Sequence, residues 1–355
     1  MKRFLLCMPE ELVVADDLGG AYRLQYMLRG MQPTCAAADP FASDRLYCGT
    51  DGQGLWVSDD GGDHWTSLQD GIPDGTITSV FVSPSRRNGR FGVVYAGTEL
   101  SSVYVSEDGG SRWTECGDIR SLSSYAKWSF PPKPETHNVR TIAEDAARGG
   151  LYVAIEAGAL IRMRDSGGEW IDTEPGHPLD AHALITHPKR PNRVHAACSD
   201  GVAVPGRSVL ASLDGGNTWA PDSDGLEHRY LFGMAVDSHD PDILLVSASE
   251  DARAAYDHSA AHSVIYRKQG SRPWRKVQRG LPPAQGTMVA NLAADPAEPG
   301  VFYALNNRGL YRSADSGITW NAMELEWKEE YIRQQPHRRH RSALLVLNKD
   351  SGGSR

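Results

Sequence analysis

The segment Ser58-Asp59-Asp60-Gly61-Gly62-Asp63-His64-Trp65 follows the pattern Ser-x-Asp-x-Gly-x-x-Trp, and this pattern decides the fold. Three further copies begin at Ser106, Ser212 and Ser313 and match at every specified position. Weaker copies are centred on Asp165 and Asp17, and a last one keeps only its tryptophan. A turn that recurs at a roughly constant spacing indicates an array of similar structural units.

The aromatic residue that closes each turn sets the length of the unit. Seven such residues occur along the chain: Tyr22, Trp65, Trp113, Trp170, Trp219, Trp274 and Trp320. They lie 43 to 57 residues apart, which is the size of a four-stranded propeller blade. The sequence therefore predicts an all-β, seven-bladed β-propeller of antiparallel blades. Six blades are the alternative if the copy at Tyr22 is only a flap.

The chemistry of the turn is structural. Glycine permits the positive φ angle of a reversal, and an aspartate carboxylate accepts N–H groups from its own turn. The indole ring packs against a neighbouring unit. We therefore assign structural roles to the turn residues Asp60, Trp65, Asp108, Trp113, Asp165, Trp170, Asp214, Trp219, Asp315 and Trp320.

The first unit lacks its innermost strand. Residues 4–8 have the pattern of a second strand, whereas the apolar segment 342–347 near the other end has no blade of its own. Pairing the two segments closes the ring and leaves no exposed edge. The predicted boundaries are 1–349 for one propeller domain, about 1–30 and 336–349 for the shared blade, and 350–355 for a disordered tail.

Composition narrows the partners and the compartment. The net charge is −8, and the basic cluster at 337–341 is best explained as a solvated loop, so we expect no nucleic-acid partner. No apolar stretch is long enough for a membrane span or a signal peptide. Five cysteines without metal-ligand spacing indicate a reducing compartment. We expect a cytoplasmic monomer that does not bind membranes.

Acidic residues recur where the second strand of each unit ends. Six of the seven units have one at this place: Glu10, Asp51, Glu99, Glu156, Asp200 and Glu250. In a propeller these positions open on one face around the central axis. The acids are either a solvated rim with turn caps or part of a site.

The beginnings of three consecutive first strands carry histidine. His137 precedes Arg140 in one unit, His182 follows Asp180 in the next, and the third contains His228, Arg229 and Tyr230. Histidines at equivalent positions on converging elements can bind a metal such as Zn, Mn or Fe together with Glu156, Asp200 or Glu250, with Ca as a further option. They can also act without a metal as acid and base while Arg140 and Arg229 hold the ligand. A purely structural role is the third alternative.

Two insertions flank the same face. The proline-rich loop before His137 contains Trp128 and Phe130, which we interpret as an aromatic lid. The insertion at 250–263 contains Arg253, Tyr256, His258 and His262, which we interpret as a wall of the site.

The four complete turns resemble the Asp-box of the bacterial neuraminidase (BNR) repeat, which is also found in sortilin-type propellers and photosystem II assembly factors. Segment 128–140 is similar to a segment of bacterial sialidase-like glycosyl hydrolases. The resemblance implies a propeller and, for its function, either a hydrolase or a binding protein. Sialidases use three arginines and a tyrosine–glutamate pair. Their pattern is not found here, since the nearest candidate, Arg23, falls in an outer strand.

These observations predict a glycosidase-like hydrolase that acts on a small polar or anionic substrate. The alternatives are a metal-dependent enzyme of another class and a non-catalytic propeller that binds protein or carbohydrate. The predicted catalytic residues are His137, His182, His228, Glu156 and Glu250, and a tentative metal site consists of the three histidines. The predicted ligand-binding residues are Arg140, Arg229, Tyr230, Trp128, Phe130, Asp51, Glu99 and Asp200.

Overall fold

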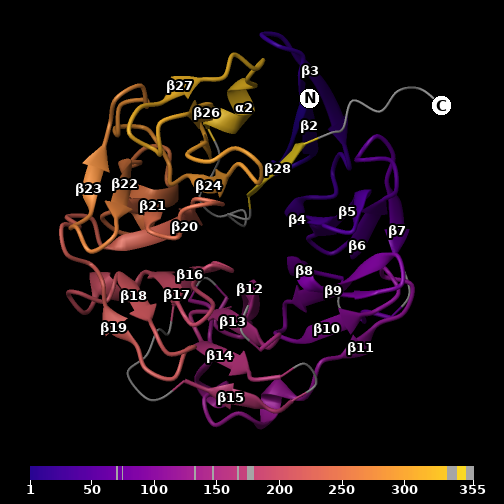
Figure 1. Ribbon diagram of the computed structural model, residues 1–355. Coiled ribbons are helices and arrows are strands. Elements are labelled where there is room, and N and C mark those ends of the chain that lie inside the picture. Colours follow the sequence, from indigo (N-terminus) through magenta and orange to yellow (C-terminus); the bar gives the residue numbers. More distant parts are fainter. Residues whose placement is uncertain are drawn as a thin grey trace.

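Seven four-stranded antiparallel sheets form a ring in this computed structural model (Figure 1). The structure describes residues 1–348 except 69–70, 74, 132, 146–147, 166–167, 174–179 and 334–341. The predicted seven-bladed propeller is confirmed, and the six-bladed alternative is wrong. The predicted tail at 350–355 and the basic cluster at 337–341 lie outside the described residues.

The blades are numbered in chain order, and the last one is shared by both ends of the described chain. Blades 1 to 3 consist of β4 (Pro33–Asp39), β5 (Ala42–Thr50), β6 (Leu55–Ser58) and β7 (Thr66–Leu68); β8 (Ile77–Asn88), β9 (Phe91–Thr98), β10 (Val103–Ser106) and β11 (Thr114–Glu115); β12 (Asn138–Glu144), β13 (Leu151–Glu156), β14 (Ala159–Met163) and β15 (Trp170–Asp172).

Blades 4 to 7 consist of β16 (Ala181–Thr186), β17 (Val194–Cys198), β18 (Val209–Ser212) and β19 (Ala220–Pro221); β20 (Tyr230–Val236), β21 (Ile243–Ser249), β22 (Ser263–Gln269) and β23 (Arg275–Val277); β24 (Asn291–Ala294), β25 (Phe302–Asn306), β26 (Gly309–Ser313) and β27 (Asn321–Ala322); β28 (Ala343–Asn348), β1 (Lys2–Cys7), β2 (Leu12–Asp17) and β3 (Tyr22–Met27). The helices are short: η1 (Ile119–Ser121), η2 (Tyr125–Lys127), η3 (Asp200–Val202), α1 (Ala252–Tyr256) and α2 (Glu329–Ile332). Among the described residues, no helix has the length and apolar character needed to cross a membrane.

The first strand of each blade packs beside the first strand of the next blade, around the centre of the ring (Figure 1). The last gap is closed by β28, which pairs with β1 from Lys2 opposite Asn348 to Cys7 opposite Ala343. The segment predicted to donate the missing strand is therefore the one that does so. With β28 in place, each described first strand lies between the first strands of the two adjacent blades.

The repeated turns act as staples, as predicted. In blade 1 the hydroxyl of Ser58 donates to Asp60 and accepts the N–H of Gly62, while Asp60 accepts the N–H groups of Asp63 and His64. Asp108, Asp214 and Asp315 accept the same kinds of bond in their own turns. Partial burial works against ionisation, but these hydrogen bonds lower the pKa of Asp60 to about 2. The carboxylates of the turn aspartates therefore accept hydrogen bonds from the backbone of their own turns.

The hydrophobic core lies between blades. Trp320 and Phe302 of blade 6 pack with Leu245 of blade 5 in one buried cluster. Gly317, in the turn before Trp320, has a φ of 81°, and a Cβ there would lie 2.5 Å from Leu245. The turn therefore needs glycine both for its conformation and for the close approach of the neighbouring blade.

A bulge recurs near the start of the first strand in blades 1 to 5. The residues in the bulges of blades 1 to 4 are Thr34, Thr78, Arg140 and His182. Bulges redirect side chains. Thr34 donates to the carbonyl of Ile77, and Thr78 donates to the carbonyl of Val139 at 2.6 Å. The bulged residue thus joins its blade to the next one.

A buried histidine outside the candidate site makes stability depend on pH. Burial of His195, with the nearby charges of Arg193 and Lys268, lowers the pKa of its imidazole to about 3. The unfolded chain has a pKa near 6.5 and binds the proton more tightly, so this contribution to stability is complete above pH 6.5 and is lost as the pH falls toward 3. Between pH 7 and 4.5 we expect the free energy of unfolding of the wild type to fall about 3 kcal/mol more than that of His195→Gln. Urea denaturation at both pH values measures this difference, and parallel losses would contradict it.

Candidate functional site

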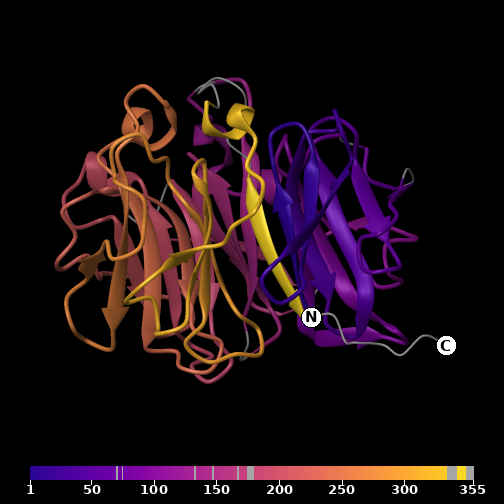
Figure 2. The same cartoon turned by 90° about the horizontal axis from the view of Figure 1, so that it is seen from above.

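The second strands end, and the next first strands begin, on the face of the ring that carries α1 and α2 (Figure 2). Three of the predicted acids on this face have structural partners. Asp51 accepts a hydrogen bond from Thr76 at 3.1 Å, Glu99 pairs with Lys133 at 3.5 Å, and Asp200 accepts the N–H of Asp180 at 3.2 Å. These contacts favour the rim interpretation for all three. Glu10 is exposed.

The three predicted histidines are buried, but they do not meet at one site. His137 accepts the N–H of Ser101 through Nδ1 at 3.1 Å and packs against Trp128, whereas His182 contacts Tyr230 and His228 contacts Tyr266. Among the described residues, the group whose ligand atoms lie within 4.8 Å of one another consists of His228, Glu250 and His262. The structure does not bring the three histidines of the predicted metal site together, because His137 is bonded to the preceding blade, His182 to the next one and His228 within its own.

The predicted lid and one predicted ligand-binding arginine also take other positions. Trp128 is buried in the core cluster between blades 2 and 3, and its indole N–H donates to Ser124 at 3.0 Å. Phe130 is partly buried in a loop that closes on itself, since its N–H donates to the carbonyl of Thr136. Trp128 is therefore a core residue and not an exposed lid. Arg229 is exposed between two buried residues, His228 and Tyr230.

Arg140 lies at the centre of a polar and aromatic group from blades 3, 4 and 5, which we call the Arg140 cluster. Its members are Arg140, Glu156, Asp180, His182, Tyr230, Phe232 and Tyr256. The guanidinium carbon lies 4.9 Å from the ring centroid of Phe232. Tyr256, in α1, packs edge-to-face on Phe232 and accepts a hydrogen bond from Tyr230 at 3.0 Å. The insertion at 250–263 thus supplies one wall, and it adds Tyr256, which is not among the predicted catalytic or ligand-binding residues.

His182 serves mainly to hold the cluster together. Its Nδ1 lies 2.6 Å from the carbonyl oxygen of Leu231, and because a carbonyl can only accept, Nδ1 carries a proton. This bond to the next first strand is the one that Thr34 and Thr78 make in their blades. The other nitrogen, Nε2, lies 3.5 Å from Asp180 and 3.9 Å from Glu156.

The two acids of the cluster differ in how they are held. Asp180 accepts hydrogen bonds from the N–H of Ala157 and the hydroxyl of Ser199. Burial favours its neutral form, but His182, these hydrogen bonds and Arg140 lower the pKa of Asp180 below its ordinary value. Glu156 is buried, with 9% of its surface exposed. Among the described residues, its carboxylate forms an ion pair with His182 and accepts no hydrogen bond. Asp180 is therefore kept ionised and fixed, whereas Glu156 has oxygens with unused hydrogen-bonding capacity.

Arg140 departs from the pattern of the other bulged residues. Its guanidinium makes no hydrogen bond or ion pair with any described residue, and its contact is the face of Phe232. Burial disfavours its charge, but Glu156, Tyr256, Tyr230 and Asp180 raise the pKa of Arg140 above its ordinary value. A charged group with five donors is thus directed into a polar cluster without a partner.

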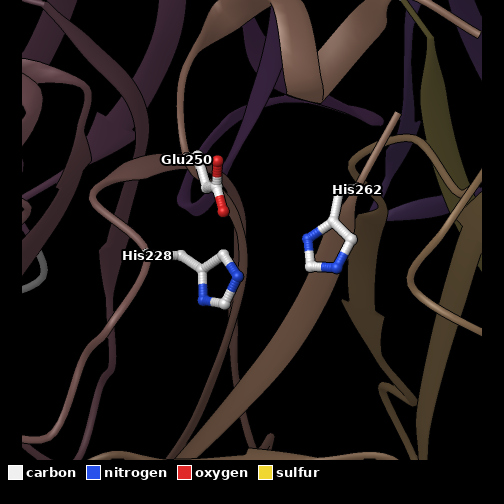
Figure 3. Close-up of side chains that lie close together, drawn as sticks. All are labelled: His228, Glu250 and His262. Carbon is white, nitrogen blue, oxygen red and sulfur yellow. The ribbon is translucent and has the colours of Figure 1, made fainter. Parts of the chain in front are cut away.

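A second group lies nearby in blade 5. His228, Glu250 and His262 point toward one another from three segments of the chain (Figure 3). Burial, together with Lys276 and His262, lowers the pKa of His228. Two of these residues, His228 and Glu250, are among the predicted catalytic residues, and His262 is added by the structure.

Neither a protein-family model nor a curated protein matches the sequence. Solved propellers are similar in structure. An ancestral GH74 enzyme is 16% identical with a TM-score of 0.62, over 84% of this chain and 39% of that one, so this chain spans about two fifths of the enzyme's length. YCF48 from Cyanidioschyzon merolae is 12% identical with a TM-score of 0.55, over 83% and 86% of the two chains. YCF48 bound to D1 peptide is 17% identical with a TM-score of 0.55, over 82% and 81%. At these identities the likeness establishes the propeller fold.

Proposed function

We propose that the Arg140 cluster binds a small hydroxyl-rich ligand of the carbohydrate type and that the protein is a hydrolase-like propeller. The observation that carries the proposal is that two oppositely charged groups of one blade, the guanidinium of Arg140 and the carboxylate of Glu156, lack hydrogen-bonding partners of their own. Glu156 is buried and Arg140 is half-buried, and an unsatisfied polar group costs more free energy the less water reaches it. A ligand that accepts from Arg140 and donates to Glu156 removes this cost.

The remaining members favour a neutral polar ligand. The positive charge of Arg140 is already opposed by Glu156 and Asp180, so the cluster has no excess of positive charge for a strongly anionic group. Phe232 and Tyr256 offer aromatic surface to the apolar side of a ligand. A sugar ring combines hydroxyl groups at its edge with such an apolar side.

For hydrolysis we assign different roles to the two acids. Asp180, whose pKa is held below its ordinary value, acts as the ionised carboxylate that stabilises positive charge or activates water. Glu156, whose free oxygens can first take up a proton from solvent, donates that proton to the leaving group. Arg140 and Tyr256 orient the ligand, and His182 positions Asp180.

The experiment measures turnover of a panel of 4-nitrophenyl glycosides by the wild type, Glu156→Gln and Glu99→Gln. Glu99 is the matched control, because it directly follows the second strand of the preceding blade but is paired with Lys133. We expect Glu156→Gln to lower kcat at least about a hundredfold while ligand binding is retained, because proton transfer contributes about 10²–10⁴-fold. Glu99→Gln should keep the wild-type rate. Equal rates for the two variants would contradict the assignment of Glu156.

The second candidate function is non-catalytic binding at the same cluster. It is supported by the extensive engagement of His182 and Asp180 in structural hydrogen bonds. The fold is compatible with either function, since it is shared with a GH74 enzyme and with YCF48 bound to D1 peptide. Saturable sugar binding by the wild type without turnover, lost in Arg140→Met, would establish this candidate.

We further propose that the chain is a member of the Asp-box (BNR) repeat propellers. The support is the hydrogen-bond pattern shared by the four complete turns. The five free cysteines, four of them buried, support the proposal that the protein works in a reducing compartment. The alternative of a metal-dependent reaction would use the group formed by His228, Glu250 and His262.

A further inference from the structure

Three side chains of blade 5 that can ligate a metal converge at the base of the β21–β22 insertion (Figure 3). His228 precedes β20, Glu250 follows β21, and His262 precedes β22. One ligand atom from each lies within 4.8 Å of the other two. The group therefore joins both ends of the insertion to the neighbouring first strand.

The ring of His228 is held in a fixed orientation. The hydroxyl of the buried Tyr266 lies 2.7 Å from Nδ1 of His228, and the same hydroxyl accepts the N–H of Glu227 at 3.3 Å. Because Nδ1 is engaged, Nε2 is the nitrogen that faces Glu250 and His262 (Figure 3). Metal-binding histidines are commonly held in this way through their second nitrogen.

His262 is held by its backbone, whereas its ring lacks a hydrogen bond. Its N–H donates to the carbonyl of Ala254 at 2.9 Å, and its carbonyl accepts from Ser249 at 2.8 Å. Nδ1 of the ring is buried and has no hydrogen-bond partner among the described residues. The ring lies nearly parallel to that of His228, with the centroids 5.8 Å apart. A buried nitrogen without a hydrogen-bond partner is unfavourable, so the protein's own hydrogen bonds do not explain this orientation.

We infer that His228, Glu250 and His262 form a binding site for a divalent transition-metal ion of the zinc class. Two imidazoles and one carboxylate suit such ions, whereas Ca²⁺ and Mg²⁺ prefer oxygen ligands. Zinc bonds of 2.0–2.1 Å place neighbouring ligand atoms of a tetrahedron about 3.3 Å apart, so small side-chain rotations complete the site. Glu250 is exposed, which leaves a coordination position open to water.

The site has a structural consequence for the Arg140 cluster. The insertion whose ends the ion joins contains α1, and α1 carries Tyr256, which accepts a hydrogen bond from Tyr230. A bound ion therefore fixes the segment that forms one wall of the cluster. Metal binding itself does not depend on the proposed hydrolysis, and it can be measured without any substrate.

The experiment is a titration of EDTA-treated full-length protein with Zn²⁺ in competition with a chromophoric zinc indicator. We expect the wild type to bind one equivalent, and His262→Phe and Glu250→Gln to bind at least tenfold more weakly. His258→Ala is the matched control, because His258 lies in the same insertion but outside the group. Since Nδ1 of His262 makes no hydrogen bond, His262→Phe should keep the Tm of the metal-free wild type, so weaker binding would not reflect misfolding.

Thermal unfolding with and without Zn²⁺ gives a second readout. A Tm that rises with Zn²⁺ in the wild type and in His258→Ala, but not in His262→Phe, supports the site. The inference is overturned if the wild type does not bind Zn²⁺ or if His262→Phe binds it as tightly. Equal affinity of the wild type for Ca²⁺ and Zn²⁺ would overturn the assigned class of ion.

Discussion

A chain that ends at Ser342, and so lacks β28, is expected to lose the cooperative unfolding transition of the propeller. β28 contributes Leu344 and Val346 to the cluster shared with blade 6, and Leu345 and Leu347 to the cluster shared with blade 1. Full burial of one such side chain contributes about 1.5–3 kcal/mol, so four that are mostly partly buried contribute about 5 kcal/mol. Since a folded protein is stable by only about 5–15 kcal/mol, we expect most of the stability to be lost.

Calorimetry and size-exclusion chromatography of the truncated chain measure this effect. The matched control ends after Asn348, so it removes residues beyond β28 but keeps the strand. We expect this control to unfold at the wild-type temperature. A truncated chain without β28 that keeps the wild-type transition would show that the ring does not need closure by this strand.

The second large effect is expected for Arg3→Met. The guanidinium of Arg3 donates to both oxygens of Asp16 at 2.6 and 2.9 Å, and also to Gly61 and Asp63 in the turn of the next blade. Arg3 and Asp16 are each only 1% exposed. Burial favours the neutral acid, but Arg3 and Arg23 hold the pKa of Asp16 below its ordinary value. Removing Arg3 strands this buried charge, and we expect a loss of about 3–5 kcal/mol in the free energy of unfolding, measured in urea.

Two further variants identify the cause of that loss. Arg23→Ala removes a contact to the same carboxylate from a side chain that is 55% exposed, so we expect a change below about 1 kcal/mol. The double variant Arg3→Met with Asp16→Leu removes both buried charges and should be more stable than Arg3→Met alone. If the double variant is as unstable as the single one, the stranded charge is not the reason.

The repeated turn made the ring predictable, because it carries a local signal in every blade. Its serine, aspartate and glycine bond within eight residues, so their pattern does not depend on distant parts of the chain. The missing first strand of blade 7 was predictable for the same reason. Once the register was known, segment 342–347 was the remaining apolar strand.

The site was less predictable, because it depends on bulges and on the path of one insertion. A bulge turns the side chain of His182 toward the next blade and directs Arg140 over Phe232, and no sequence spacing indicates either orientation. The histidines were also predicted to be equivalent, but His182 occupies the bulge of its first strand, as Arg140 does, whereas His137 and His228 precede theirs. The insertion contains His258 and His262, and only the folded path, with His262 bonded to Ala254, shows which of them reaches Glu250.

The pairing of β28 with β1 also has a consequence for biosynthesis. Lys2 leaves the ribosome long before its partner Asn348, because 346 positions separate them in the chain. At about 5–20 residues per second, roughly 17–70 s pass between the two. During this time the edge of β1 that later pairs with β28 lacks its partner strand, and an unpaired strand edge is prone to pair with another chain. Synonymous codons that speed translation of the later blades should shorten this exposure and raise the yield of folded protein.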